Sequence, residues 1–436
     1  MSDWKGRRLH FIAIGGAGMS GLALIADRLG AEVSGSDRAE SSYLERLRDA
    51  GLEPRVGHDA DAVPAGADVV VSTAIADGNP ELVRARERGQ RVLHRGELLA
   101  EICQEKRLIA VAGTHGKTTT AGMLVCALRG LGDDPAFALG GELPGAGPGG
   151  AAANAGWGKG EWIVAEADES DASFLELSPE VAVVTNVELD HHSRWSSRAE
   201  LFAAFRRFAE PAAGLSLGAG PELDPLAEGA GRVVRFDSSS PGPALELPVP
   251  GEHNVLNARA ALGAVELAGL DVGAAAGALA AFPGMARRLE RKGEVNGAVI
   301  YDDYAHHPTE VAAGLAALRE LAPRRLIAVF QPHLYSRTKA LAAGFGAALA
   351  AADEIGVLDV YAAREEPVGP LAGVSGLAVA EAAAERSGGR RVWWLRDVDG
   401  AARALAPRLR PGDLLVTIGA GDVFRLADSL VEGGGG

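Results

Sequence analysis

The sequence predicts an α/β protein of two or three domains built on mostly parallel sheets. The chain has 436 residues, which is more than one hydrophobic core usually organises. Short apolar runs alternate with helical patterns along most of the chain, as they do where helices cover parallel strands. Two of these runs lead straight into glycine turns that open helices, a connection typical of such sheets.

The first hundred residues contain three expected strands and the helix that joins the first two. The strands are expected at 9–14, 32–36 and 69–72, and the helix at 20–29. A helix and a linker are expected over 98–106. This alternation predicts a parallel, doubly wound sheet.

A second unit is expected to start with a strand at 108–112, followed by a glycine turn and a helix to about Arg129. Further strands are expected at 161–166 and 181–186, and a helix at 253–268.

Two segments of this unit are rich in glycine and proline. The segment 140–160 predicts a flexible surface loop, and the segment 211–250 predicts a small irregular lobe.

A third unit is expected after the Phe-Pro-Gly segment at 282–284. Its strands are separated by alanine-rich helical segments, and they are expected at 298–301, 326–330, 355–358, 392–395 and 414–418.

The composition excludes several classes of protein. Hydrophobic residues make up 47% of the chain and charged residues 23%, which rules out a mainly disordered chain and a coiled coil. No apolar run reaches about 18 residues, so membrane insertion is not expected. The first five residues lack an apolar signal segment, so the cytoplasm is the expected compartment. Two cysteines, Cys103 and Cys126, are too few for a disulfide framework or a four-cysteine zinc site.

The charge of the chain narrows its expected partners. It carries 43 basic and 58 acidic residues, a net charge of −15, so sequence-independent binding of nucleic acid is not expected. An anionic small molecule can still be bound by backbone N–H groups and a few basic side chains.

The strongest local signal is the segment 113–118, Gly-Thr-His-Gly-Lys-Thr, between an expected strand and an expected helix. Backbone N–H groups of such a turn point at phosphates, helped by the positive end of the helix. Lys117 supplies a cation for the β- and γ-phosphates, and Thr118 supplies a hydroxyl for Mg²⁺. An ordinary glycine turn beside an exposed lysine is the plain alternative. The order of strand, glycine, lysine and threonine favours a phosphate loop.

A second glycine turn, Gly-Ala-Gly-Met-Ser-Gly at 16–21, follows the expected strand at 9–14. Asp37 ends the next strand, so the pattern matches a dinucleotide fingerprint with Asp37 on a ribose hydroxyl. A nucleotide sugar fits this turn as well as a nicotinamide dinucleotide, and a tight turn without a ligand stays open. Together the two turns suggest that the chain binds two different nucleotides, one as phosphoryl donor and one as anchor of the molecule to be modified.

Carboxylates follow two expected strands of the second unit. Glu166 ends one strand and opens the acidic segment 166–173, and His191 lies after the next strand. Carboxylates at strand ends beside a phosphate loop commonly hold Mg²⁺. Glu166 is therefore a candidate ligand and His191 a less usual one, with a solvated acidic turn as the alternative.

Polar clusters recur in the last part of the chain. Asn254 and Asn257 are three residues apart and share one helix face. Arg288 opens the third unit, and polar segments follow two strands at 301–308 and 330–338. Such clusters at the strand ends of an open α/β sheet bind ligands, although each alone could be a capping or turn cluster.

Taken together, these segments resemble the Mur ligase family over nearly the whole chain. The resemblance is carried by 10–21, 113–120, 166–174 and 301–310. It implies a Rossmann-like UDP-sugar-binding domain, a central P-loop ATPase-like domain with a mostly parallel sheet, and a C-terminal Rossmann-like domain. Their expected bounds are 1–105, 106–283 and 284–436.

The branch of the family that this chain resembles most adds the first amino acid of the peptidoglycan stem peptide. The resemblance implies an ATP-dependent, ADP-forming ligase that joins L-alanine to the carboxylate of UDP-N-acetylmuramate through an acyl phosphate. Mg²⁺ would assist, and the enzyme would be a monomer or a homodimer.

The resemblance also implies roles for individual residues. ATP would be bound by Gly113, Thr114, His115, Gly116, Lys117, Thr118 and Thr119. Mg²⁺ would be held by Thr118, Glu166 and His191. The UDP-sugar would be bound by Gly16, Ala17, Gly18, Met19, Ser20, Asp37 and Ser72. The catalytic set would be Lys117, His191, Asn254, Asn257, Arg288 and Asp303. The incoming amino acid and the muramyl carboxylate would lie near Tyr304, His306, His333 and Arg337.

Three alternatives stay open. A related ligase could attach a whole murein tripeptide to the same nucleotide sugar. A nicotinamide-dependent oxidoreductase would explain the turn at 16–21 but would leave the segment 113–118 unused. A non-catalytic nucleotide-binding protein would make the metal and C-terminal clusters incidental.

Overall fold

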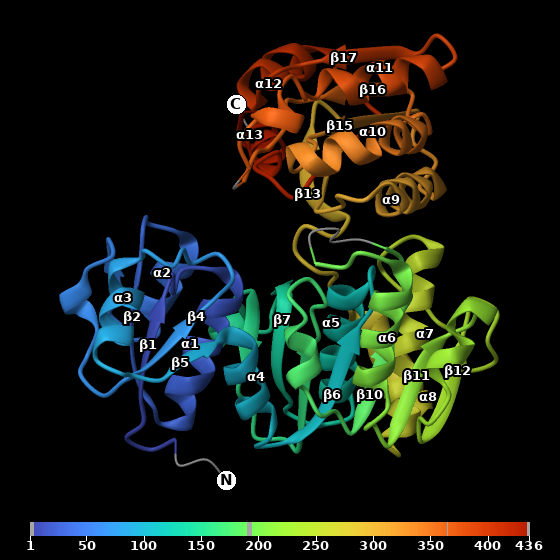
Figure 1. The fold of residues 1–436 in the computed structure, drawn as a ribbon. Coiled ribbons are helices and arrows are strands. Elements are labelled where there is room, and N and C mark those ends of the chain that lie inside the picture. The colour runs from blue at the N-terminus through green and yellow to red at the C-terminus, as the bar shows by residue number, and fades with distance from the viewer. Residues whose placement is uncertain (1–3, 190–193, 364, 434–436) are drawn as a thin grey trace. The chain divides into compact units, whose positions relative to one another are not determined.

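The computed structural model describes residues 4–189, 194–363 and 365–433, and it confirms the α/β fold class (Figure 1). Its strands form three sheets that are mostly parallel. Contacts divide the chain into two compact units, Met1–Pro248 with Val255–Pro283, and Val249–Asn254 with Gly284–Gly436. The separation of the first unit into domains at residue 105 stays a prediction.

The first sheet is fully parallel, with the strand order β3-β2-β1-β4-β5. Its strands are β1 (Arg8–Ile12), β2 (Glu32–Asp37), β3 (Arg55–Val56), β4 (Asp68–Val71) and β5 (Val92–His94). Its helices are α1 (Ala17–Leu29), α2 (Ser42–Asp49), α3 (Pro80–Glu87) and α4 (Arg95–Cys103), with the short 3₁₀ turn η1 (Ala60–Ala62). The strand order reverses between β1 and β4, and ligands bind at such a switch point.

Local sequence explains where these helices begin and end. The Ser41 hydroxyl accepts a hydrogen bond from Leu44 N at the start of α2, and Asn79 caps α3 just before Pro80. Gly30 ends α1 in the left-handed conformation, with φ of 101°. A capping box between His94 and Glu97 opens α4.

The second sheet has the order β12-β11-β10-β6-β9-β7-β8, and only the pairing of β7 with β8 is antiparallel. Its strands are β6 (Arg107–Ala112), β7 (Ala136–Leu143), β8 (Ala153–Gly156), β9 (Trp162–Glu166), β10 (Val181–Val184), β11 (Gly214–Gly218) and β12 (Arg232–Phe236). Its helices are α5 (Lys117–Gly130), α6 (Arg198–Ala209), α7 (Glu252–Leu267) and α8 (Val272–Ala278). Its 3₁₀ turns are η2 (Pro148–Gly150), η3 (Ser173–Glu176), η4 (Pro221–Leu226) and η5 (Leu279–Ala281). The central strand β6 lies between β9 and β10, so the residues that follow these three strands meet at one edge.

The prediction of a flexible loop over 140–160 is wrong for much of its length. β7 runs into this segment, and β8 pairs with β7. Glycine and alanine are needed here because α1 packs closely on β8. A Cβ added to Gly21 would lie 2.8 Å from Ala155 Cβ. The small residues that this close packing requires therefore give the composition of a loop, although they form a strand.

The predicted irregular lobe over 211–250 is also wrong in part. It supplies β11 and β12, which extend the sheet in parallel from β10. All five residues of β11 are buried, although glycine begins and ends the strand. Gly214 packs against Leu267 of α7, where an added Cβ would lie 3.0 Å from the leucine Cβ.

The third sheet belongs to the second unit and has the order β13-β14-β18-β15-β16-β17. Its strands are β13 (Glu290–Val295), β14 (Ala298–Asp303), β15 (Arg325–Phe330), β16 (Glu354–Val357), β17 (Arg391–Trp394) and β18 (Asp413–Ile418). Only β13 is antiparallel to its neighbour. Its helices are α9 (Pro308–Glu320), α10 (Tyr335–Leu349), α11 (Leu377–Arg386), α12 (Val398–Leu405) and α13 (Phe424–Gly433), with 3₁₀ turns η6 (Gly369–Leu371) and η7 (Ala406–Arg408). No strand was predicted over β13, because its residues are mostly polar and partly exposed.

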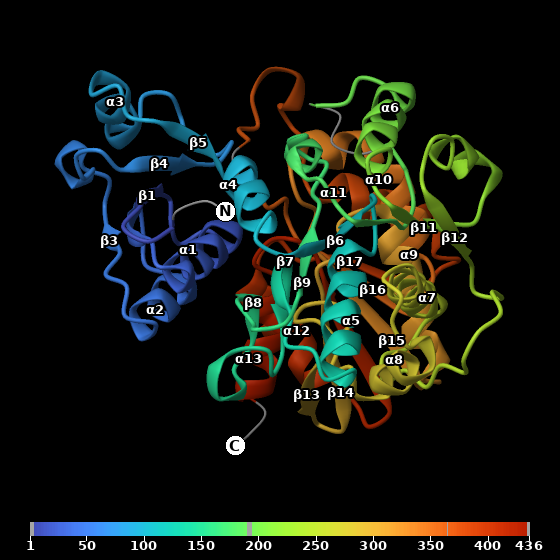
Figure 2. The ribbon, with the colours of Figure 1, turned by 90° about the horizontal axis from the view of Figure 1, so that it is seen from below.

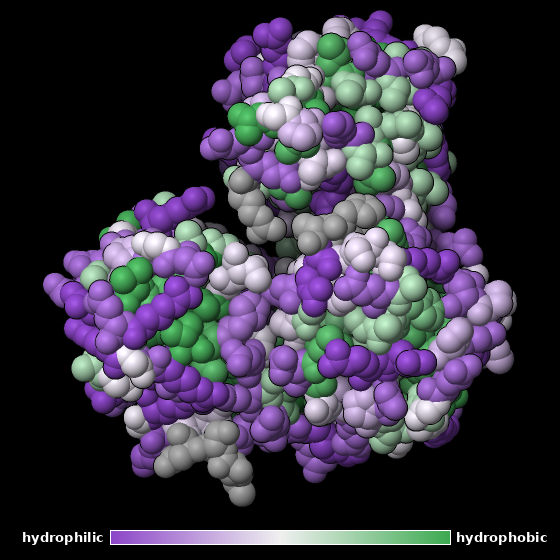
Figure 3. Space-filling model, in the orientation of Figure 1, coloured by the Kyte–Doolittle hydropathy of each residue, from purple (hydrophilic) through white to green (hydrophobic). Residues whose placement is uncertain are grey.

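In the first unit, α4 lies between the first and second sheets (Figure 1 and Figure 2). It contacts β4 and β5 of the first sheet and the 3₁₀ turn η3, which follows β9 of the second sheet. Hydrophilic residues cover most of the visible surface of the molecule, and hydrophobic residues form smaller separate patches (Figure 3). Among the described residues, no helix combines the length and apolar character needed to cross a membrane.

Candidate active site

The segment 113–118 forms a tight loop between β6 and α5, as the sequence predicts. Gly113 has a φ of 136° and Gly116 a φ of 82°, a region that favours glycine. An added Cβ on Gly113 would collide with Thr185 Oγ1, and one on Gly116 with Asn257 Oδ1. The loop therefore needs glycine at both positions. α5 starts directly after it, so the positive end of that helix lies at the loop.

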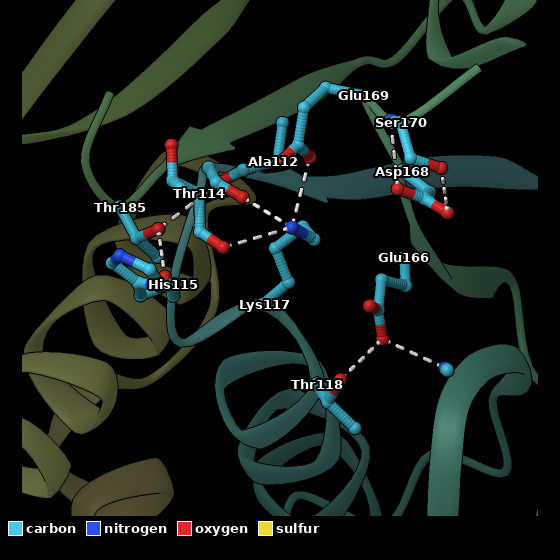
Figure 4. A network of polar contacts seen from close by, with 12 residues as sticks. Ala112, Thr114, His115, Lys117, Thr118, Glu166, Asp168, Glu169, Ser170 and Thr185 are labelled. Carbon is cyan, nitrogen blue, oxygen red and sulfur yellow. Dashed lines mark hydrogen bonds and ion pairs between the residues drawn. The ribbon is translucent and has the colours of Figure 1, made fainter. Parts of the chain in front are cut away.

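The Lys117 ammonium group folds back over this loop (Figure 4). Its Nζ donates to Gly113 O at 2.6 Å, Thr114 O at 3.2 Å and Glu169 Oε2 at 2.9 Å. Burial alone would lower the pKa of Lys117, but the carboxylates of Glu169, Asp168 and Glu166 raise it above its ordinary value. Lys117 is therefore a fixed positive charge at the centre of the loop.

Thr118 and Glu166 form a cluster of oxygen atoms beside the lysine. Thr118 Oγ1 donates to Glu166 Oε2 at 2.8 Å, and Gly140 N donates to the same carboxylate oxygen at 2.7 Å. A hydroxyl and a carboxylate next to a phosphate loop are the donors that Mg²⁺ prefers, so these residues fit that ion. The third predicted ligand, His191, lies outside the described residues.

The other side of the loop is fixed to the end of β10. Thr114 exchanges two hydrogen bonds with the Glu188 backbone, both of 2.9 Å. His115 N donates to Asn186 Oδ1 at 2.9 Å. These contacts fix the loop to the segment that follows β10.

The predicted asparagine pair falls on both sides of the boundary between the units. Asn257 is buried in the first unit and accepts a hydrogen bond from Thr120 Oγ1 at 3.3 Å. Asn254 is counted with the second unit, where its Nδ2 donates to Pro250 O at 2.7 Å. The two residues lie on the same helix, α7.

The glycine turn at 16–21 lies at the N-terminus of α1. Gly16 is the N-cap and has no side chain to cap the helix, so the first N–H groups are available to a ligand. Met19 and Ser20 are buried in α1, and Ser20 N donates to Gly16 O at 2.9 Å within the first turn of the helix. Asp37 Oδ2 accepts a hydrogen bond from Gly15 N at 2.9 Å. Asp37 thus lies beside the turn; its contact with a ribose stays a prediction.

A pocket of about 210 Å³ connects this turn with the oxygen cluster. Gly18 and Gly21 line it on one side, and Gly140 and Glu166 line it on the other. Asn154 also lines the pocket, and its Nδ2 donates to Ala17 O at 2.6 Å. Ser72 follows β4 and is absent from this lining.

The predicted residues of the second unit meet around the end of β14. The rings of Tyr304 and His306 lie edge to face at 5.5 Å, and those of His306 and His333 at 6.4 Å. The Arg288 guanidinium lies 5.2 Å from the Tyr304 ring centre. Arg337 Nη1 is 3.5 Å from His333 Nδ1. The four predicted substrate residues and Arg288 therefore form one cluster.

Burial sets the charges of this cluster. It raises the pKa of Asp303 to about 7, against the opposing effect of Arg288 and with support from Glu310 and Asp302. It lowers the pKa of His306 to about 4, with Arg337 acting in the same direction and Glu310 opposing. Near neutral pH the cluster therefore holds a neutral imidazole beside a carboxyl group that is partly protonated.

Comparisons with known proteins identify the family. A model described as the Mur ligase family, catalytic domain, matches residues 8–107, and one described as Mur ligase, glutamate ligase domain, matches 287–421. A protein of Kineococcus radiotolerans named UDP-N-acetylmuramate–L-alanine ligase is 47% identical, and the match covers 98% of this chain and 96% of that protein. This chain belongs to the Mur ligase family.

Further Mur ligases agree with this assignment. A protein of the same name from Nocardioides is 45% identical over 97% of this chain and 95% of its own length. The crystal structure of a UDP-N-acetylmuramate–alanine ligase from Thermotoga maritima matches with a TM-score of 0.82 at 27% identity, and 98% of each chain is covered. A murein peptide ligase from Psychrobacter arcticus matches over 98% of each chain with a TM-score of 0.69 at 25% identity.

Two residues of this Mur ligase site were not predicted from the sequence. Glu169 is 1% exposed and is the carboxylate partner of Lys117. Arg95 begins α4 and lines the pocket. The acidic run at 166–173 was the only signal for Glu169, because its partner is set by packing. Arg95 lies in no phosphate-binding pattern, so nothing in its local sequence distinguished it from other arginines.

Proposed function

We propose that this Mur ligase joins L-alanine to the carboxylate of UDP-N-acetylmuramate, with ATP as the source of an acyl phosphate and with ADP and phosphate as products. The names of relatives at 44–47% identity over nearly the full chain support this proposal. One structural observation carries it. A single pocket joins the glycine turn of α1 to Glu166, which is bonded to the phosphate loop through Thr118.

The chemistry explains why two nucleotides are needed. A carboxylate is a poor electrophile because its charge is delocalised and an oxide is a poor leaving group. Phosphorylation by ATP gives an acyl phosphate, the amine of L-alanine attacks its carbonyl carbon, and phosphate leaves from the tetrahedral intermediate. In this proposal the turn at 16–21 anchors the nucleotide sugar, and the loop at 113–119 holds ATP.

The first unit would perform the phosphoryl transfer. Lys117 would neutralise the charge that gathers on the γ-phosphoryl group, which is the main catalytic task in this kind of reaction. Thr118 and Glu166 would hold Mg²⁺, with His191 as a further proposed ligand. When bound, Mg²⁺ supplies positive charge at the phosphate oxygens. Gly140 N fixes the Glu166 carboxylate in place through its hydrogen bond.

The second unit would receive the amino acid. Within this cluster the neutral His306 offers a hydrogen-bonding group. The cationic Arg337 beside His333 offers a partner for the carboxylate of the amino acid. Tyr304 and His333 complete its wall, and Arg288 and Asp303 are proposed to act at ATP. The setting that we propose is the cytoplasmic stage of peptidoglycan precursor synthesis.

An assay of ADP release tests the proposal. We expect release only when UDP-N-acetylmuramate and L-alanine are both present. Lys117→Ala should lower the rate about 100- to 1,000-fold, the usual effect of losing one charge-stabilising group. Lys159→Ala is the matched control, because Lys159 is exposed and lies outside the pocket, and it should leave the rate unchanged.

Two results would count against the proposal. ADP release without the nucleotide sugar would point to a simple ATPase. Faster release with a murein tripeptide than with L-alanine would favour the tripeptide-adding activity.

A further inference from the structure

Arg95 is the only lysine or arginine among the described residues that line the pocket in the first unit. It is the first residue of α4, the helix that lies between the two sheets of that unit (Figure 2). Its side chain is 27% exposed, so a ligand in the pocket can reach it.

One terminal nitrogen of the Arg95 guanidinium group, Nη1, faces the glycine turn of α1. A Cβ built on Gly18 would lie 3.2 Å from Arg95 Nη1, so glycine leaves room for the guanidinium group beside the turn. The backbone of this turn can take a diphosphate at the helix N-terminus. A diphosphate placed there would be within reach of Arg95.

The second terminal nitrogen, Nη2, is held by the acidic segment that follows β9. Arg95 Nη2 donates to Asp171 Oδ2 at 3.0 Å and lies 3.4 Å from Asp168 Oδ2. The same acidic segment supplies Glu169, the partner of Lys117.

We propose that Arg95 binds the diphosphate of the nucleotide sugar and that Asp168 and Asp171 hold it in place until this anion arrives. The inference rests on the proposed function, because it needs a nucleotide diphosphate in the pocket. A guanidinium group can bind two phosphate oxygens at once, which suits a diphosphate better than a single anion.

The exchange of partners leaves neither carboxylate isolated. Asp168 keeps hydrogen bonds from Ser170 N at 3.0 Å and Ser170 Oγ at 2.9 Å. Asp171 keeps a hydrogen bond from Ser173 N at 3.0 Å. Both aspartates thus remain satisfied when the arginine turns toward the pocket, so the movement needs little rearrangement.

Binding of UDP and of uridine to the full-length protein, measured by calorimetry, tests this role. Saturating Mg-ADP is added first, so that the phosphate loop is filled and UDP reports on the pocket. Arg95→Gln should weaken UDP binding at least about tenfold, as expected for the loss of charge-assisted hydrogen bonds. Uridine, which carries no phosphate, should bind the variant as it binds the wild type.

Asp171→Asn should change the affinity for UDP in the opposite direction. It removes a competitor for the guanidinium group, so UDP binding should become a few-fold tighter. Asp168→Asn is the second variant and should act in the same direction if Asp171→Asn fails to fold. The matched control is Arg46→Gln. Arg46 also joins a helix of the first sheet to the second sheet, through ion-paired bonds of 2.7 and 2.9 Å to Glu142, but it lies outside the pocket.

A purely structural role for Arg95 predicts a different pattern. Loss of the bridge would then weaken UDP and uridine alike, and Asp171→Asn would weaken them as well. That result, or unchanged UDP binding in Arg95→Gln, would overturn the inference and leave the proposed function intact. A wild-type protein that binds no UDP at all would instead sink the proposed function.

Discussion

Lys117 and Asp303 show two ways in which this protein accommodates a buried charge. Lys117 has three acceptors within 3.2 Å, and nearby carboxylates keep it charged despite its burial. Asp303 is 7% exposed and lies near other acidic groups, and its pKa rises to about 7. One group is thus held ready to bind an anion, while the other changes its charge near neutral pH.

The raised pKa of Asp303 makes the stability of the protein depend on pH. In the unfolded chain this carboxyl group loses its proton near pH 4, whereas in the folded chain it keeps the proton up to about pH 7. Between these values the folded state binds more protons, so a rise in pH destabilises it. Asp303→Asn removes this effect. Relative to the wild type, its free energy of unfolding should rise between about pH 4 and 7, by up to about 1.4 kcal/mol per pH unit.

His306 provides a control of opposite sign for this measurement. Its pKa is about 4 in the folded chain and about 6.5 in the unfolded chain, so the unfolded state binds more protons in that range. The wild type therefore gains stability from this group as pH rises. His306→Gln should lose stability relative to the wild type over that range. Urea unfolding at several pH values measures both variants, and a pH-independent difference for Asp303→Asn would show that the carboxyl group titrates normally.

At the scale of elements, the sequence predicted well where strand, loop and helix follow one another directly. The connection of β6, the glycine loop and α5 was found because it lies in one continuous segment. The pairing of β7 with β8 was not predicted, because the small residues of these strands are required by close packing against α1 and do not show a strand pattern. The partnerships of Glu169 with Lys117 and of Arg95 with Asp171 were also missed. Each joins residues more than 50 positions apart, and residue pattern alone does not bring such residues together.

The packing of β7 against β9 gives an element-scale prediction. A Cβ on Gly140 would lie 2.6 Å from Glu166 Oε2, the oxygen that Thr118 and Gly140 N both contact. Gly140→Ala should push the carboxylate out of place and raise the Mg²⁺ concentration needed for half-maximal ADP release about tenfold, as disturbed support of a metal ligand commonly does. Titration of the ADP-release assay with Mg²⁺ measures this shift.

Gly277→Ala is the matched control for this substitution. Gly277 lies in α8, and an added Cβ would meet nothing within 4 Å. The change should stabilise the protein by about 0.5–1 kcal/mol, because alanine is the better helix former, and should not alter the Mg²⁺ requirement. An unchanged requirement in Gly140→Ala as well would separate Glu166 from metal binding.

At the scale of the whole molecule, the chain crosses between its two compact units three times, after Pro248, after Asn254 and after Pro283. The phosphate loop, the oxygen cluster and the pocket all lie in the first unit. The cluster that contains His306 and His333 lies in the second. The first unit has two sheets and the second has one, and each unit has its own buried core. Proteins with several such cores often unfold in more than one step.

This separation predicts that a ligand of the phosphate loop stabilises one unit only. Mg-ADP at about 100 times its dissociation constant should stabilise the first unit by about 2.7 kcal/mol and raise its unfolding temperature by several degrees. Scanning calorimetry should then show one transition moving and one staying in place. Lys117→Ala should abolish the shift of this transition, because the variant loses the lysine that binds the nucleotide phosphates. If both transitions move together in the wild type, the two units unfold as one cooperative block, and nucleotide binding energy is shared across the whole chain.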